Sequence, residues 1–232
     1  MQVLALDAST EWCSVALGGE AGFEERIEAA GQRHSELMLP MVESLLSSVR
    51  MSLARLDGIA FGAGPGSFTG LRIACGLAQG LALGAGLRLV GIGTLLAMAE
   101  VARRRHGARR VLAALDARMH EVYAAAYELE GEHWRERIAP TVANPEAVPT
   151  PPGTRWFAAG GGFAAYPALR SRVASAVAGF DAAIAPSAAA VAALALPRFV
   201  AGEGVPPRDA APLYVRHRVA VTTLERSAGV VL

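Results

Sequence analysis

Two stretches of the chain, about half its length apart, repeat the same order of residue types. One reads VLALDAST from Val3, and the other reads LAALDARM from Leu112. In each, an apolar run ends at Asp-Ala, a short polar turn follows, and a second β-prone run comes next. This order predicts a β-hairpin whose first strand is buried and whose turn begins with a carboxylate. Because the two aspartates, Asp7 and Asp116, are 109 residues apart in a chain of 232, the repeat predicts two similar lobes.

The segments between and after the hairpins carry alternating helix and strand patterns. Apolar residues at helical spacing predict a helix over 34–50 with Ser35 as its N-cap, and a β-prone run predicts a strand over 56–61. A glycine-rich loop then leads into a second helix, which Ser67 or Thr69 can cap. Further patterns predict strands over 88–91 and 155–159 and helices over 94–106 and near 187–200. We therefore expect an α/β chain whose two lobes comprise residues 1–105 and 106–232.

The composition excludes two familiar chemistries. The sequence has no lysine, so all 22 basic residues are arginine, and neither a Walker-type phosphate lysine nor a Schiff-base lysine is possible. The glycine loop also departs from the dinucleotide pattern G-x-G-x-x-G, because Gly62 and Gly64 lead to Ser67. A net charge of +1 gives no overall field that would attract nucleic acid.

The two cysteines and the first residues of the chain give information about the cellular compartment of the protein. Cys13 and Cys75 form no CxxC pair, which is typical of small buried thiols in a reducing compartment. The start has no positively charged signal region. The most apolar window, 73–87, contains Gln79 and is shorter than the roughly 20 residues of a membrane span. We expect a cytoplasmic protein without a transmembrane segment.

Several motifs carry a resemblance to a known family. They are LALDAST from Leu4, GAGPGSFTGLRI from Gly62, AQGLA from Ala78, LDARMHEVY from Leu115 and PLYVR from Pro212. Two lobes that each open with an aspartate-bearing hairpin are the outline of the actin/sugar-kinase/heat-shock-ATPase (ASKHA) fold, whose lobes are ribonuclease H-like. Together the motifs resemble the TsaB (YeaZ) family, a bacterial subunit of the machinery that makes threonylcarbamoyladenosine in tRNA. Residues 128–211 add little to the resemblance.

The resemblance implies a non-catalytic subunit. It would activate a TsaD-like transferase that moves a threonylcarbamoyl group from its adenylate to an adenosine beside the tRNA anticodon. TsaD carries a His-x-x-x-His metal pair where this chain reads VGIGTLLAM from Val90, so we predict no catalytic residue, no metal and no cofactor. The expected partners are the TsaD-like subunit in a heterodimer, a TsaE-like ATPase in the larger complex, a second copy when the chain is alone, and tRNA mainly through the complex.

The two hairpin turns leave a second interpretation open. Asp7 and Asp116 could grip a metal–nucleotide complex between the lobes, or each could cap its own turn. The residues of this degenerate nucleotide site would be Asp7, Ser9, Thr10, Asp116, Arg118 and Gly161. An autonomous small-molecule kinase of the same fold would need that pair in a closed cleft. A protease-like enzyme would need metal ligands or a Ser/His pair that no spacing suggests.

The helix after the glycine loop is apolar nearly all round and contains Gly76, Gly80 and Gly84 at four-residue spacing. An interior glycine costs about 1 kcal/mol relative to alanine, a loss that is offset where backbones pack closely. Either the whole helix is core, or its outer side meets a partner. With the family resemblance we predict a partner interface made of Met38, Met41, Leu45, Ile73, Leu77, Ala78, Gly80 and Leu81.

Arginines cluster at one place, at 103–105 and 109–110. Cations at the end of the helix over 94–106 suit its dipole, and a contact with tRNA phosphate or with an acidic partner is the alternative. Histidines occur singly, which favours surface or capping roles over metal binding; they are His34, His106, His120, His133 and His217.

Overall fold

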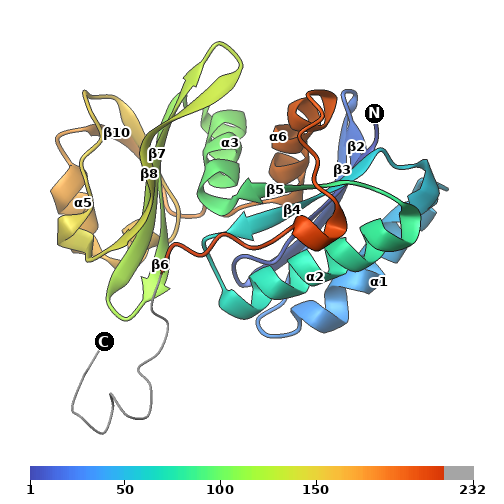
Figure 1. Ribbon diagram of the computed structural model, residues 1–232. Coiled ribbons are helices and arrows are strands. Elements are labelled where there is room, and N and C mark those ends of the chain that lie inside the picture. The colour runs from blue at the N-terminus through green and yellow to red at the C-terminus, as the bar shows by residue number, and fades with distance from the viewer. Residues whose placement is uncertain (217–232) are drawn as a thin grey trace, which may run out of the picture.

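The computed structural model describes residues 1–216 (Figure 1). It contains two five-stranded sheets, ordered β3-β2-β1-β4-β5 and β10-β9-β6-β7-β8. Listed from its other edge, the second sheet has the strand order β8-β7-β6-β9-β10. In order of appearance along the chain, this is the same strand order as in the first sheet. Each sheet is an antiparallel meander of three strands followed by two strands parallel to the central one. The predicted α/β fold with two similar ribonuclease H-like lobes is confirmed.

The first sheet consists of β1 (Val3–Asp7), β2 (Trp12–Gly19), β3 (Gly22–Ala29), β4 (Gly58–Gly64) and β5 (Leu89–Gly93). All five residues of β1 and all seven of β4 are buried, as expected of strands covered on both faces. The strand β4 extends through Gly62 to Gly64, so part of the predicted loop belongs to the sheet. Two helices lie on one face, α1 (His34–Ser48) and α2 (Phe68–Ala85).

The predicted caps of these two helices have different outcomes. Ser67 precedes α2, and its Oγ accepts a hydrogen bond from the Gly70 N–H at 3.2 Å, as expected. Ser35 is not the cap of α1, because the helix begins at His34 and Arg33 precedes it without a side-chain cap.

The second sheet consists of β6 (Arg110–Arg118), β7 (Glu121–Glu130), β8 (His133–Ala143), β9 (Trp156–Ala159) and β10 (Val177–Asp181). Its outer face packs on the short helices α4 (Gly162–Ala165) and α5 (Pro167–Val173). Between the two sheets lie α3 (Thr94–His106) and α6 (Ala188–Val200), as Figure 1 shows. The layers therefore run from α1 and α2 through the first sheet, α3 and α6, and the second sheet to α4 and α5.

The helix α6 follows the second sheet in the chain but packs on the first one. It contacts all five strands of the first sheet and also α3. Its first turn is held by that sheet: the Ala188 N–H donates to Ser14 Oγ at 3.0 Å and the Ala189 N–H donates to Glu25 Oε1 at 2.8 Å. The two sheets fall on either side of the predicted boundary at residue 105, while α6 joins the halves. The boundary itself stays a prediction.

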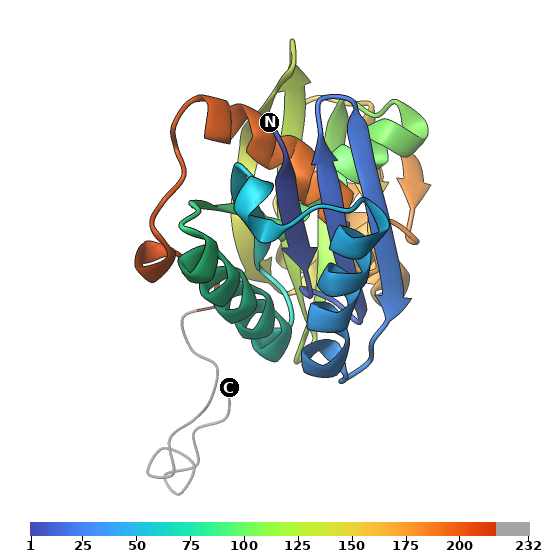
Figure 2. The ribbon, with the colours of Figure 1, turned by 90° about the vertical axis from the view of Figure 1, so that its right-hand side faces the viewer.

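One helix of the described part, α2, is long and apolar enough to cross a membrane by length and composition alone. Buried core helices pass the same test. In Figure 2, α2 and α1 lie beside each other over the near face of the first sheet. The residues of α2 that are buried against the rest of the chain include Leu71, Ala74, Ala78 and Ala82.

Candidate functional site

The glycine-rich segment at the end of β4 packs directly on the turn of the first hairpin. A Cβ at Gly62 would overlap the Oδ2 atom of Asp7, and a Cβ at Gly66 would overlap the carbonyl oxygen of Ser9. The Ser67 N–H donates to that same carbonyl at 2.8 Å. Glycine is required at both positions because the Asp7 side chain and the Ser9 backbone occupy the space that a Cβ would fill.

At this contact the carboxylate of Asp7 is shielded from solvent. Its side chain is buried, and Ser9 donates to it twice, from its backbone N–H at 3.1 Å and from its Oγ at 2.9 Å. Burial raises the pKa of Asp7 to about 6, although the two hydrogen bonds from Ser9 lower it. The carboxylate therefore caps its own turn.

The raised pKa of Asp7 gives a prediction about stability and pH. The folded state binds this proton more tightly than the unfolded state, so the stability it contributes is complete below the ordinary pKa of 3.8 and is lost as pH rises through about 6. As pH rises across that window, the free energy of unfolding of the parent chain should fall by about 3 kcal/mol relative to that of Asp7→Asn, whose side chain does not titrate. Urea unfolding at several pH values measures this difference. Parallel curves for the two chains would contradict the raised pKa.

The second hairpin turn also uses its carboxylate locally. Asp116 Oδ1 accepts hydrogen bonds from the Arg118 N–H at 2.8 Å and from the Tyr166 hydroxyl at 2.8 Å, and Arg118 Nη1 lies 3.1 Å from Oδ2. Arg118, Met119 and His120 all have left-handed φ angles, between 55° and 63°. Non-glycine residues adopt this conformation at a cost, which the bonds to Asp116 offset. Tyr166 was not predicted, because a single tyrosine 50 positions away carries no sequence signal.

The other members of the predicted nucleotide site are placed separately. The Thr10 Oγ1 accepts from the Trp12 N–H at 3.3 Å, and the Thr10 carbonyl lies 3.0 Å from His34 Nε2. Gly161 precedes α4, and no atom lies within 4 Å of the position a Cβ would take there. Among residues 1–216, the two carboxylates share no hydrogen-bonding side chain: Ser9 donates to Asp7, and Arg118 and Tyr166 donate to Asp116. A shared nucleotide site stays a prediction.

The tail after α6 crosses the glycine loop. The Leu213 N–H donates to the Ala63 carbonyl at 2.7 Å. Arg72 Nε donates to the Tyr214 hydroxyl at 3.0 Å, and its guanidinium lies 3.8 Å from the centre of the Phe68 ring. Leu213 and Tyr214 of the PLYVR motif thus lie on the first lobe, while His217 is outside the described residues.

Arg216 continues the tail to the second hairpin. Its Nη2 donates to the Ala117 carbonyl at 3.0 Å and to Glu121 Oε2 at 2.5 Å. The tail therefore bridges the loop of one lobe and the turn of the other. The hollow that it borders there, between Pro65 and Tyr123, has a volume of about 40 Å³.

The predicted partner residues separate into two groups. Four of them lie in the chain's own core and are not available to a partner in this structure: Met38, Met41, Leu45 and Ala78. The other four are half-buried or exposed on α2: Ile73, Leu77, Gly80 and Leu81. What we call the outer stripe of α2 consists of Ile73, Gly76, Leu77, Gly80, Leu83 and Gly84. The interface itself stays a prediction.

The thiols are packed as the sequence predicts. Burial raises the pKa of Cys13 to about 11 and also raises the pKa of Cys75, whose Sγ lies 3.8 Å from the Ala210 carbonyl. Such thiols stay protonated and unreactive near neutral pH. In the described part of the chain, no group of three or more His, Cys, Asp or Glu is arranged to hold a metal.

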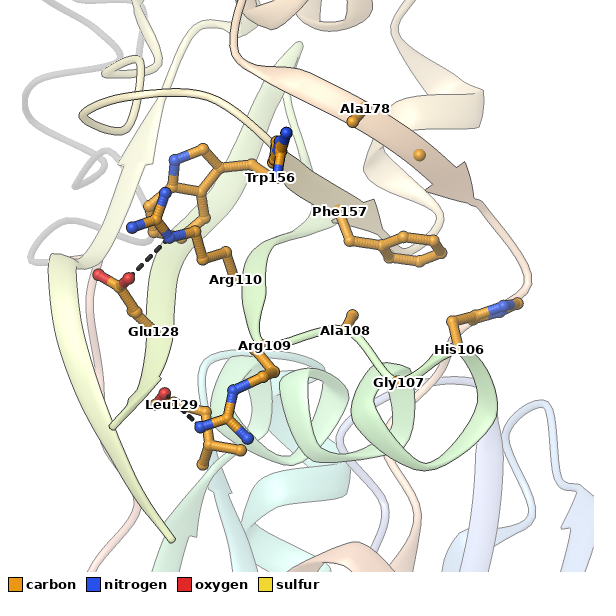
Figure 3. Close-up of a pocket in the computed structure, with 12 residues that line it drawn as sticks. His106, Gly107, Ala108, Arg109, Arg110, Glu128, Leu129, Trp156, Phe157 and Ala178 are labelled. Carbon is orange, nitrogen blue, oxygen red and sulfur yellow. Dashed lines mark hydrogen bonds and ion pairs between the residues drawn. The ribbon is translucent and has the colours of Figure 1, made fainter. Parts of the chain in front are cut away.

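The arginine cluster splits in the structure. Arg103 and Arg104 bind Glu100, which also accepts from Trp134 Nε1 at 3.1 Å. Burial raises the pKa of Glu100, but the three hydrogen-bonding partners outweigh it and hold that pKa below its ordinary value. Arg109 and Arg110 instead line a pocket at the end of the second sheet where its parallel strands begin (Figure 3).

Comparison with known proteins places the chain in a family. The family model described as "TsaD: tRNA N6-adenosine threonylcarbamoyltransferase" matches residues 27–200. A relative from Escherichia coli (strain K12), named tRNA threonylcarbamoyladenosine biosynthesis protein TsaB, is 40% identical over 95% of this chain and 96% of its own length. The TsaB protein of Haemophilus influenzae is 38% identical over 94% of this chain and 95% of its own.

A solved structure agrees. YeaZ from Pseudomonas aeruginosa superposes with a TM-score of 0.86 at 40% identity, covering 92% of this chain and 99% of the other. Each of these three matches covers more than nine-tenths of the chain. The chain belongs to the TsaB (YeaZ) family.

Proposed function

We propose that this chain is a non-catalytic subunit of the machinery that makes threonylcarbamoyladenosine in tRNA, and that it pairs with a TsaD-like transferase. The names of its relatives place them in this biosynthesis. The observation that carries the pairing is the outer stripe of α2. In that stripe a helix presents apolar and glycine residues to the outside of a folded chain.

The stripe has the geometry of a helix-packing surface. Its members recur at three- and four-residue spacing on the side of α2 opposite the buried Leu71, Ala74 and Ala78. No atom lies within 4 Å of the Cβ position of Gly76, Gly80 or Gly84, and Leu83 is 76% exposed. Exposed glycines that cost helix stability and contact nothing in the chain are explained by close approach of a partner helix.

The hairpin turns support the non-catalytic part of the proposal. Both carboxylates that could grip a nucleotide are already hydrogen-bonded, Asp7 within its own hairpin and Asp116 both within its hairpin and to Tyr166. The hollow that the tail borders between Pro65 and Tyr123 has a volume of only about 40 Å³, and neither Asp7 nor Asp116 lines it. An autonomous kinase of this fold is the second candidate, and ATP turnover by the isolated chain that Asp7→Ala abolishes would favour it.

The wider assembly follows from the same proposal. We place the complex in the cytoplasm, where tRNA and a TsaE-like ATPase would meet the heterodimer, with tRNA contacted mainly through the transferase. Without its partner, the stripe would pair with the stripe of a second copy, because self-association covers the same apolar face.

Two substitutions on the stripe test the pairing. Gly80→Arg fills the space that a partner helix would occupy, and Leu83→Glu adds a charge to the apolar face. Each is expected to weaken binding to the TsaD-like partner about 30-fold, the effect of losing roughly 2 kcal/mol at an interface hot spot. Calorimetric titration with the purified partner measures it.

A matched control uses Val200→Glu, which adds the same charge at a 70% exposed position at the end of α6. Its affinity should equal that of the parent chain. If both stripe variants fold and bind like the parent, the partner surface lies elsewhere on the chain.

A further inference from the structure

An open pocket of about 590 Å³ lies where the second sheet's parallel strands begin. The turn between α3 and β6, the end of β7 and the first residues of β9 and β10 form its walls (Figure 3). The hairpin turn with Asp116 is at the other end of β6, which starts at Arg110 and ends at Arg118. The pocket is therefore distinct from both hairpin turns and from the outer stripe of α2.

The charges of the pocket are predominantly positive. Three guanidinium groups line it, from Arg109, Arg110 and Arg155, against the single carboxylate of Glu128. That carboxylate is shared, because Arg110 Nε lies 2.6 Å from Oε1 and Arg137 Nε lies 2.9 Å from Oε2. The bonds from these two arginines hold the pKa of Glu128 below its ordinary value. An anion entering the pocket meets uncompensated positive charge.

Two of the guanidinium groups are fixed in place before any ligand arrives. Arg110 Nη1 donates to the Thr154 carbonyl at 3.2 Å, in addition to its bond with Glu128. Arg109 Nη2 donates to the Leu129 carbonyl at 3.1 Å. Each of these two guanidinium groups has further N–H groups that can donate to a ligand. Within residues 1–216 no hydrogen bond or ion pair holds Arg155, whose backbone is left-handed at a φ of 65°.

An aromatic wall stands beside the arginines. The Phe157 ring stacks on the His106 ring with centroids 4.7 Å apart and planes inclined by 27°. His106 is itself held by Asp181, with Nε2 and Oδ2 2.8 Å apart. In Figure 3 the Phe157 side chain extends toward His106 on the far side of the pocket from Glu128. The exposed His106 ring, backed by Phe157, offers a flat surface for stacking. A flat surface next to fixed guanidinium groups matches a nucleotide, which has a planar base next to a phosphate.

We propose that this pocket binds a nucleotide, with the phosphate on Arg109, Arg110 and Arg155 and the base against the Phe157–His106 stack. The volume lies within the range of small-ligand sites. The same chemistry is offered by a free mononucleotide and by an unpaired nucleotide of an RNA strand. The inference depends on the pocket alone and not on the partner proposed for α2.

The test titrates the full chain with AMP, with ribose 5-phosphate and with a single-stranded hexamer of adenylate RNA, at low ionic strength. Ala178 is an exposed residue of the pocket wall, and Ala178→Glu adds a carboxylate beside the arginines. Ala174→Glu is its control, an exposed position just after α5. Arg155→Gln removes the unbonded guanidinium, and Arg208→Gln makes the same change at an exposed site outside the pocket.

Saturable binding of AMP is expected, weakened about tenfold by Ala178→Glu and by Arg155→Gln and unchanged in the two controls. If the RNA hexamer binds more tightly than AMP, the ligand of the pocket is a nucleotide within an RNA strand. If it binds equally or more weakly, the ligand is a free mononucleotide. Absence of saturable binding, or equal affinity of Ala178→Glu and parent, overturns the site. Equal affinity for ribose 5-phosphate and AMP overturns its assignment to a nucleotide. These measurements use the chain without its partner, so their failure leaves the α2 interface untouched.

Discussion

The Leu45→Glu variant is expected to lose its folded structure. Leu45 is fully buried in the core between α1 and the first sheet. A carboxylate there has no partner and no water, so the free energy of unfolding should fall by more than about 4 kcal/mol. Most domains are stable by only about 5–15 kcal/mol, so such a loss removes most or all of the stability. Circular dichroism and urea unfolding measure it.

The matched variant is Leu83→Glu on α2. The same change at a side chain that is 76% exposed should leave the free energy of unfolding within about 0.5 kcal/mol of the parent value. A folded Leu45→Glu chain that fails only in partner binding would instead place Leu45 on the interface and contradict its burial in the core.

The second large effect concerns Gly70, in the first turn of α2. A Cβ there would overlap the carbonyl oxygen of Ala8 and lie 3.0 Å from its carbonyl carbon. Both atoms are backbone, so no side-chain rotation relieves the overlap. We expect Gly70→Ala to lower the free energy of unfolding by about 3 kcal/mol, the upper range for overpacked sites.

Gly80→Ala is the control on the same helix. Nothing lies within 4 Å of the Cβ position at Gly80, so alanine should raise the free energy of unfolding by about 0.5–1 kcal/mol through helix propensity alone. Thermal or urea unfolding of both variants distinguishes the two kinds of glycine. Equal effects would mean that α2 does not dock on the first hairpin as described.

The sequence predicted the architecture well because the strongest signals are local or repeated. The duplicated Leu-Asp-Ala hairpin gave both sheet centres, and the helices over 94–106 and 187–200 match α3 and α6. The strands β3, β8 and β10 were not predicted. They are edge strands exposed on one side, and runs such as GFEERIEA carry charges that hide the apolar alternation.

The candidate site was harder to predict for a physical reason. An apolar stripe on α1 indicates that the helix is covered, but it does not indicate whether the chain's own sheet or another protein covers it. Met38 and Met41 face the first sheet, whereas the glycines of α2 face outward. The pocket beside Arg109 and Arg110 joins residues up to 73 positions apart, so only the folded chain brings Phe157 and Ala178 next to those arginines.

The position of α6 has a consequence for synthesis of the chain. The first sheet is complete in sequence at residue 93, yet one of its faces is covered by a helix that ends at residue 200. At 5–20 residues per second, a ribosome needs roughly 5–20 s to make the intervening segment. During that interval the nascent chain exposes apolar strand surface that includes Ala5, Ala60 and Val90. The first lobe can therefore complete its core only after the second has been made, and a ribosome-associated chaperone would have this surface to shield.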